Sequence, residues 1–131
     1  MGRYLLDTCV LVWLLKEDDR VKELAEDINY YQGDYAVSIV SIAELLYLAQ
    51  SGKLKIDISF NELIKLLKSK QISALEGNVK TMEFLSELPF YKKHTDPLDR
   101  LIIAQAIADD RILITGDMKF KLYKKLQLIA V

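Results

Sequence analysis

The chain has 131 residues, of which 51% are hydrophobic and 28% are charged, so it is long enough for one compact domain with a sizeable core but not for two full domains. Its 18 Lys and Arg nearly cancel its 19 Asp and Glu, so no overall basic field attracts nucleic acid and a polyanionic partner must be held locally. A single cysteine, Cys9, and a single histidine, His94, exclude a disulfide framework within the chain and an ordinary structural zinc site.

The first half of the chain predicts two strands, each followed by helix. Both strand segments are short apolar runs bounded by polar residues, which is typical of strands buried on both faces. In chain order, the segments are a strand at 4–6, helices at 10–15 and 21–29, a strand at 35–37 and a helix that continues to about residue 50. Ser38 or Ser41 can cap this last helix, because a serine hydroxyl accepts a hydrogen bond from the first turn.

The second half continues the alternation of helices and strands. Its segments are a helix at 60–68, a strand at 72–75, helices at 79–88 and from 97 to 109 or 110, a strand at 112–115 and a last strand at 126–131. Strands that alternate with helices favour a parallel sheet covered on both faces. We therefore expect an α/β fold, a three-layer α/β/α arrangement with a central, mainly parallel sheet, in a single domain over residues 1–131.

Four carboxylates stand out because of their positions in this layout. Asp7 and Asp117 each follow a predicted buried strand, and Glu44 and Asp99 lie near the start of helices. In an open parallel sheet these positions share the carboxyl edge of the strands, where such folds bind ligands. Glu44 is the only charged residue between positions 42 and 49, which predicts a helix buried all round, and Asp99 lies over a mostly apolar sector of its own helix.

Carboxylates that converge in a buried place predict a bound cation. Two like charges about 4 Å apart repel by roughly 4 kcal/mol at an effective dielectric constant of about 20. A cluster made only of oxygen ligands favours Mg2+ or Mn2+ over zinc or copper. Divalent ions on carboxylates can neutralise a phosphodiester and activate a water molecule, and this chemistry needs neither histidine nor cysteine.

Four motifs resemble those of the PIN-domain ribonucleases, in particular the VapC-like toxins of prokaryotic toxin-antitoxin pairs. They are LLDT at 5–8, SIAEL at 41–45 followed by SGKL at 51–54, HTDPLDRLIIAQA at 94–106, and LITGD at 113–117. The motifs span nearly the whole chain in the family's order, and the third is the most specific. The chain departs from the pattern at Cys9, where related sequences often carry histidine, and we expect this change to affect packing more than ligation.

The resemblance implies a PIN-like fold and a Mg2+- or Mn2+-dependent endoribonuclease, usually a homodimer, that is inhibited by a small antitoxin bound in the active-site groove. The residues it assigns to catalysis and metal binding are Asp7, Glu44, Asp99 and Asp117. Among them, Asp7 and Asp99 are the strongest expected direct ligands. Around them we expect Thr8 as a hydroxyl beside Asp7, Arg100 as a bidentate ligand of a substrate phosphate, and Asp96 close to the site.

Most of these acidic residues also have an ordinary structural explanation. Asp96 precedes a proline at a helix start and is best explained as the N-cap. Asp117 can be a turn residue, and Asp7 can cap the helix that follows it. Glu44 can form a buried ion pair, for instance with Arg100 or Lys53.

Two other classes of function stay open at this point. An aspartyl-phosphate phosphatase or receiver domain also places a carboxylate after a strand, but such a phosphatase normally has a second Asp where this chain has Cys9. A non-catalytic module that binds RNA or protein is the other, although binding alone does not need a buried acidic cluster. The lysines at 92, 93, 119, 121, 124 and 125 can contact RNA phosphates, although a solvated charged surface is the simpler explanation for them.

No apolar run approaches the ~20 residues that span a bilayer, so we expect a cytoplasmic protein without a membrane partner.

Overall fold

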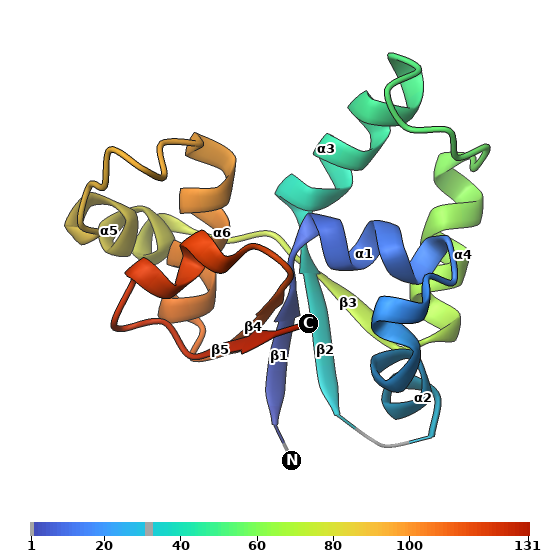
Figure 1. Cartoon of the computed structure of the whole chain (residues 1–131), viewed down its shortest axis with the longest axis horizontal. Helices are drawn as coiled ribbons and strands as arrows, with labels where there is room; N and C mark the ends of the chain where they lie inside the picture. The colour runs from blue at the N-terminus through green and yellow to red at the C-terminus, as the bar shows by residue number, and fades with distance from the viewer. Residues whose placement is uncertain (1, 31–32) are drawn as a thin grey trace.

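One five-stranded sheet lies at the centre of the computed structural model, which describes residues 2–30 and 33–131 (Figure 1). Its strands are β1 (Arg3–Leu6), β2 (Asp34–Ser38), β3 (Ile72–Leu75), β4 (Ile112–Thr115) and β5 (Leu128–Ala130). Their order across the sheet is β3-β2-β1-β4-β5, and each neighbouring pair is parallel. The predicted parallel sheet is therefore confirmed.

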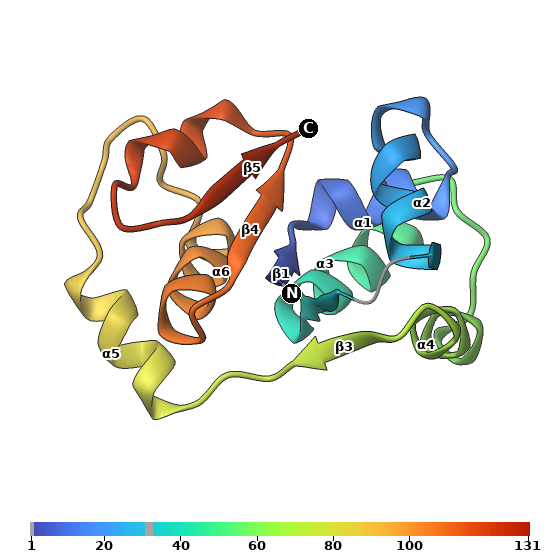
Figure 2. The same cartoon turned by 90° about the horizontal axis from the view of Figure 1, so that it is seen from below.

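Helices connect the strands and cover both faces of the sheet. They are α1 (Thr8–Leu15), α2 (Lys22–Tyr30), α3 (Ile39–Gln50), α4 (Phe60–Ser69), α5 (Val79–Glu87) and α6 (Pro97–Ala108), with short 3-10 helices η1 (Asp19–Val21) and η2 (Met118–Leu122). Figure 2 shows α5 and α6 on one side of the sheet and α1 and α2 on the other. The fold is thus the predicted three-layer α/β/α arrangement.

Two hydrophobic cores, one on each face, fix this layering. In β1, the side chain of Leu6 packs with residues of α1, α3 and α4, while that of Leu5 packs with residues of α6 and η2. Both leucines are 0% exposed. Because successive side chains of a strand point to opposite faces, a strand buried on both faces needs an uninterrupted apolar run, as this segment has.

The starts of α3 and α6 are set by polar caps. The Ser38 hydroxyl accepts a hydrogen bond from the backbone N–H of Val40, so Ser38 rather than Ser41 caps α3. The Asp96 carboxylate accepts hydrogen bonds from the backbone N–H groups of Leu98 at 2.9 Å and Asp99 at 3.1 Å. The N-cap interpretation of Asp96 is therefore confirmed, and this cap orients the first turn of α6, which carries Asp99.

Three expectations about the elements need correction. α3 is not buried all round, because only one side of it packs on the sheet, and Ile39 and Tyr47 on its other side are 45% and 58% exposed. The last strand begins at Leu128 rather than at residue 126, since the chain before it turns to bury Leu126 in the core. The helix η2 after Asp117 was not predicted.

No helix in the described residues is long and apolar enough to cross a membrane.

Candidate metal centre at the carboxyl edge of the sheet

Asp7 lies directly after β1 and is 5% exposed. One of its carboxylate oxygens, Oδ1, accepts a hydrogen bond from the backbone N–H of Thr8 at 2.8 Å, so Asp7 does cap α1 as its ordinary explanation predicts. The other oxygen, Oδ2, accepts one from the Thr115 hydroxyl at 2.7 Å. The carboxylate is therefore held by both its own helix and the end of the neighbouring strand β4.

Cys9 contributes a third contact to the same carboxylate. Its Sγ atom lies 3.4 Å from Asp7 Oδ2, and the thiol donates to that oxygen. Burial, followed by the negative charge of Asp7, raises the pKa of Cys9 to about 11. The thiol thus stays protonated at neutral pH and donates a hydrogen bond to Asp7.

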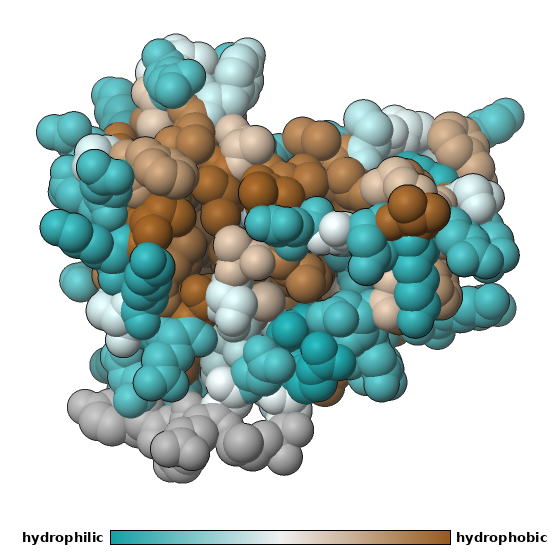
Figure 3. Space-filling model, turned by 180° about the vertical axis from the view of Figure 1, so that it is seen from behind, coloured by the Kyte–Doolittle hydropathy of each residue, from teal (hydrophilic) through white to brown (hydrophobic). Residues whose placement is uncertain are grey.

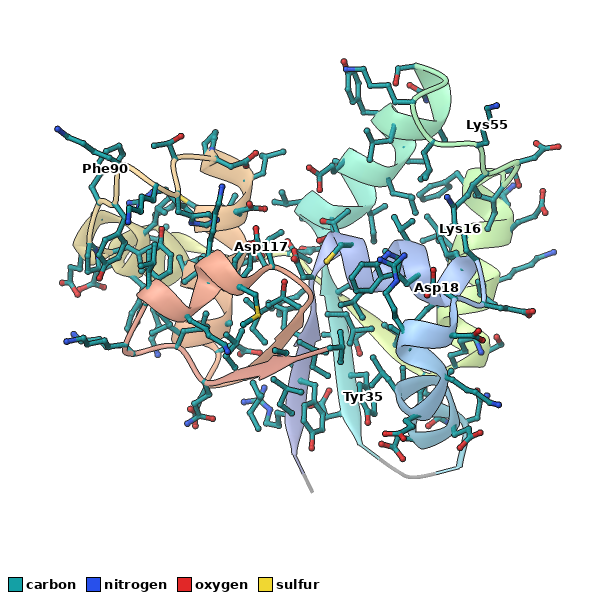
Figure 4. The ribbon with its side chains drawn as sticks, in the orientation of Figure 1. Lys16, Asp18, Tyr35, Lys55, Phe90 and Asp117 are labelled. Carbon is teal, nitrogen blue, oxygen red and sulfur yellow. The ribbon has the colours of Figure 1, made fainter. Side chains whose placement is uncertain are left out.

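Asp117 follows β4 and is the N-cap of η2, so its interpretation as a turn residue is also confirmed. Its Oδ1 accepts a hydrogen bond from the backbone N–H of Lys119 at 2.9 Å, and its own N–H donates to the Thr115 hydroxyl oxygen at 3.0 Å. Figure 4 shows Asp117 at the upper edge of the sheet, between the α6 side and the α1 and α3 side of the molecule. A residue that shapes a turn can therefore also lie at a ligand-binding edge.

Asp99, the third residue of α6, meets Asp117 and His94 at this edge. Ligand atoms of these three side chains all lie within 4.8 Å of one another, a spacing that a single metal ion could bridge. The Asp99 side chain is 26% exposed and its Oδ2 lies 3.2 Å from Nε2 of His94. Burial lowers the pKa of His94, so the imidazole is neutral near pH 7 and this contact is a hydrogen bond rather than an ion pair.

The pKa of Asp99 reflects the negative charges of the acidic residues near it. Burial, followed by the negative charges of Asp7, Asp96, Glu44 and Asp117 in that order, raises the pKa of Asp99 to about 7. Charges exert such an effect only at short range in a protein of this size. The other three carboxylates expected at the site, Asp7, Glu44 and Asp117, therefore lie close enough to Asp99 to raise its pKa.

Glu44 reaches this region from the second turn of α3, where it is partly buried. Within residues 2–30 and 33–131 it forms no ion pair, so the expected partner Arg100 does not neutralise it. The same holds for Asp7 and Asp117 in the described part of the chain. In the described residues, no protein cation therefore forms an ion pair with these carboxylates.

Two predicted neighbours of the site make different contacts. The Arg100 guanidinium donates to the carbonyl of Pro89 at 2.8 Å and lies 5.3 Å from the ring centroid of Phe90. Figure 4 shows Phe90 on the outer side of the molecule, away from Asp117, so Arg100 fastens α6 to the preceding loop. The Thr8 hydroxyl donates to Ser41 Oγ at 2.9 Å and ties α1 to α3, whereas the hydroxyl that contacts Asp7 is that of Thr115.

The donor set suits a hard divalent cation. Asp99 and Asp117 have ligand atoms close together, and Asp7 and Glu44 add negative charge that acts on Asp99. A bound cation would relieve the repulsion on Asp99. Sequence reasoning missed two supporting side chains, Thr115 and the partner of His94, Tyr123. The sequence carries a sign of the role of Thr115, because a threonine at the end of a buried strand can donate to a carboxylate at the end of the neighbouring strand. It carries no sign of the role of Tyr123, which is 29 residues from His94.

The fold is shared with known proteins. The PIN domain family matches residues 4–126 of this chain. Among solved structures, a chain of VapBC2 from Rickettsia felis bound to a promoter DNA fragment is 23% identical with a TM-score of 0.77, covering 98% of each chain. A chain of VapBC-1 from nontypeable Haemophilus influenzae is 21% identical with a TM-score of 0.72, covering 97% of this chain and 96% of that one. DNA-bound VapBC from Salmonella typhimurium gives 15% identity and a TM-score of 0.70, covering 99% and 98%. No curated protein matches the chain.

Proposed function

The chain belongs to the PIN-domain family of nucleases, and from this premise we propose that it is a Mg2+- or Mn2+-dependent endoribonuclease, the VapC-like toxin of a toxin-antitoxin pair. The observation that carries the proposal is the convergence of acidic side chains on Asp99, whose pKa is raised to about 7 by burial and by the charges around it. A region of uncompensated negative charge on a buried sheet edge is suited to binding a divalent cation. We place the protein in the cytoplasm and treat residues 1–131 as one domain.

In this proposal the acidic residues have two different roles in cation binding. Asp7 and Asp99 bind the cation directly, and Glu44 and Asp117 act through water or on a second ion. A bound divalent cation would neutralise the phosphodiester, polarise the attacking water and stabilise the leaving oxygen. The protein supports this by holding the Asp7 carboxylate with three donors, so that its orientation is set before substrate arrives.

A basic surface next to Asp117 supports RNA as the substrate. Lys93, from the loop before α6, and Lys119 and Lys121, from η2, line one shallow hollow together with Met118. The chain has almost no net charge, so a local group of lysines is what can hold a polyanion. The proposed path of the RNA backbone therefore crosses this hollow as it leaves the carboxylates.

Apolar surface supports a protein partner and a homodimer. Ile39 and Tyr47 on α3 are 45% and 58% exposed, and Figure 3 shows apolar surface gathered on the face seen from behind. Monomeric soluble proteins rarely expose contiguous apolar patches of more than a few hundred square ångströms. The similar structures are described as VapBC complexes, in line with the proposed antitoxin.

RNA hydrolysis by the purified chain tests the proposal. We expect cleavage of single-stranded RNA in Mg2+ or Mn2+, none in excess chelator, and a loss of at least about 100-fold in Asp7→Asn and Asp99→Asn while both variants stay folded. Undiminished cleavage in both variants, or equal cleavage with chelator, would contradict it. Stable phosphorylation of Asp7 by a small phosphodonor would instead favour a receiver or phosphatase, and tight RNA binding without hydrolysis in any metal would favour a binding module.

A further inference from the structure

His94 links the candidate metal centre to a buried tyrosine. Its Nε2 atom lies 3.2 Å from Asp99 Oδ2, and its Nδ1 atom lies 2.8 Å from the hydroxyl oxygen of Tyr123. His94 and Tyr123 are 4% and 3% exposed, so neither side chain can exchange these contacts for water. The carboxylate of Asp99 is therefore one end of a hydrogen-bonded series that continues through the His94 imidazole to the Tyr123 hydroxyl.

The donors and acceptors available determine which atom donates in each of these two hydrogen bonds. In the cation-binding form the Asp99 carboxylate is ionised and only accepts, so the Nε2–H of His94 donates to it. A neutral imidazole has one donor and one acceptor, which leaves Nδ1 to accept from the Tyr123 hydroxyl. Both imidazole nitrogens and the Tyr123 hydroxyl are paired in this arrangement, which specifies a single tautomer of the histidine.

Packing keeps both rings in place. The imidazole lies edge-on to Phe120, at 5.1 Å between ring centroids, and edge-on to Tyr123 at 5.4 Å. Tyr123 packs in turn against Tyr91 at 5.0 Å, and the backbone N–H of His94 donates to the carbonyl of Tyr91 at 3.0 Å. Since rotation of the imidazole would break a hydrogen bond at each nitrogen and disturb these contacts, its Nε2–H points at Asp99 as a fixed donor.

We propose that His94, oriented by Tyr123, is a positioning residue that fixes the Asp99 carboxylate for cation binding. The donor occupies Oδ2 of Asp99, which leaves Oδ1 for an ion shared with the acidic residues around it. Hydrogen-bond partners of this kind orient metal ligands, and their loss costs about 10- to 100-fold in metal affinity. The inference rests on the proposed function for the identity of the ion, but it concerns the binding of Mg2+ and Mn2+ rather than catalysis.

Calorimetric titration of the purified full-length chain with Mg2+ and with Mn2+ tests this role directly. We expect His94→Ala to weaken binding of both ions by about 10-fold, and Tyr123→Phe, which keeps the ring, to weaken both by about 3-fold. His94→Gln, whose side-chain amide can still donate to Asp99, should recover part of the loss. Tyr91→Phe is the matched control: it removes a hydroxyl from a ring packed on Tyr123 without interrupting the path to Asp99, and binding should be unchanged.

The outcomes separate this role from its alternatives. Unchanged Mg2+ and Mn2+ affinities in His94→Ala and Tyr123→Phe, with only a lower melting temperature, would mean that the two rings are merely structural and would overturn the inference. A loss confined to Ni2+, which suits imidazole ligands, with Mg2+ binding intact, would make His94 a direct ligand and would also overturn it. A wild-type chain that binds Mg2+ with the expected variant pattern yet cleaves no RNA would contradict the proposed function and leave the positioning role standing.

Discussion

The hydroxyl of Thr115 donates a 2.7 Å hydrogen bond to Oδ2 of Asp7, joining the ends of the neighbouring parallel strands β4 and β1. The same hydroxyl oxygen accepts the backbone N–H of Asp117 at 3.0 Å. Thr115 is 0% exposed, so water replaces neither contact. One buried side chain thus sets the relative positions of two of the proposed metal-binding carboxylates.

Replacing Thr115 by valine should affect both stability and cation binding. Valine has nearly the same shape, but Asp7 loses a donor and the Asp117 N–H loses its acceptor, at a cost of about 1 to 2 kcal/mol in the free energy of unfolding. We expect Mg2+ affinity to fall by about 10-fold as well. Urea unfolding and calorimetric titration measure the two effects. Thr115→Ser keeps the hydroxyl and is the control; a loss in Thr115→Ser that exceeds the loss in Thr115→Val would show that the methyl group, not the hydrogen bonds, matters.

The stability of the metal-free protein should depend on pH through Asp99. Its pKa is raised to about 7 from a usual value near 4, so between these values the folded chain holds a proton that the unfolded chain releases. Stability therefore falls as the pH rises from about 4 to about 7, and the loss persists above 7. Asp99→Asn should stabilise the protein at pH 8 by on the order of 1 to 2 kcal/mol and change little at pH 4.

Urea unfolding in chelator at both pH values checks this expectation. Asp57→Asn, at an exposed position before α4, is the control and should change stability at neither pH. Mg2+ should reverse the order at pH 8, since only the wild-type carboxylate binds the ion. An Asp99→Asn variant that is less stable than the wild type by the same amount at both pH values would contradict the repulsion among the carboxylates.

Gly116→Ala should be destabilising because of one neighbour. A Cβ atom at this position would overlap the indole ring of Trp13, and that ring is itself held by the Arg20 guanidinium 4.0 Å above its centroid. We expect a loss of about 1 to 3 kcal/mol by thermal or urea unfolding. The loss should shrink in a Trp13→Leu background, and an identical loss in both backgrounds would show that the indole is not the obstacle.

Arg111 should matter more than Arg3, although both contact Asp34 and Asp109. The Arg111 side chain is 7% exposed and also donates to the carbonyl of Tyr4, whereas the Arg3 side chain is 46% exposed. We expect Arg111→Met to lower the free energy of unfolding by about 2 kcal/mol or more and Arg3→Met by less than about 1 kcal/mol. Equal losses would mean that burial does not distinguish the two arginines.

Charge reversal in the basic hollow should weaken RNA binding without harming the metal centre. In Lys119→Glu with Lys121→Glu, we expect a higher KM for RNA, a shallower dependence of binding on salt and an unchanged Mg2+ affinity. Lys65→Glu with Lys68→Glu on the exposed side of α4 is the matched control and should leave KM within about 2-fold. A KM that rises equally in both double variants would point to net charge rather than to this surface.

The order of strands and helices could be predicted because it depends on local patterns. Short apolar runs bounded by polar residues specified the strands, and Pro97 after Asp96 marked the start of α6. The edge at which Asp7 and Asp117 lie follows from parallel strand pairing alone. These features need no knowledge of side-chain conformation.

Contacts between distant side chains could not be predicted in this way. The partners of His94 and Arg100 depend on rotamers and on how the loop before α6 folds back, which residue spacing does not encode. Arg100 was expected to bind a substrate phosphate, yet its guanidinium donates a hydrogen bond to the carbonyl of Pro89. The exposure of Tyr47 likewise depends on which side of α3 the sheet covers, and an apolar helix gives no sign of it.

Anomalous diffraction from crystals soaked in Mn2+ shows whether acidic side chains from separate segments share a divalent cation. We expect a strong peak in contact with the carboxylates of Asp7 and Asp99 and within reach, directly or through water, of Asp117 and Glu44. Ordered density for all four side chains with no peak among them at saturating Mn2+, while RNA cleavage continues, would contradict it.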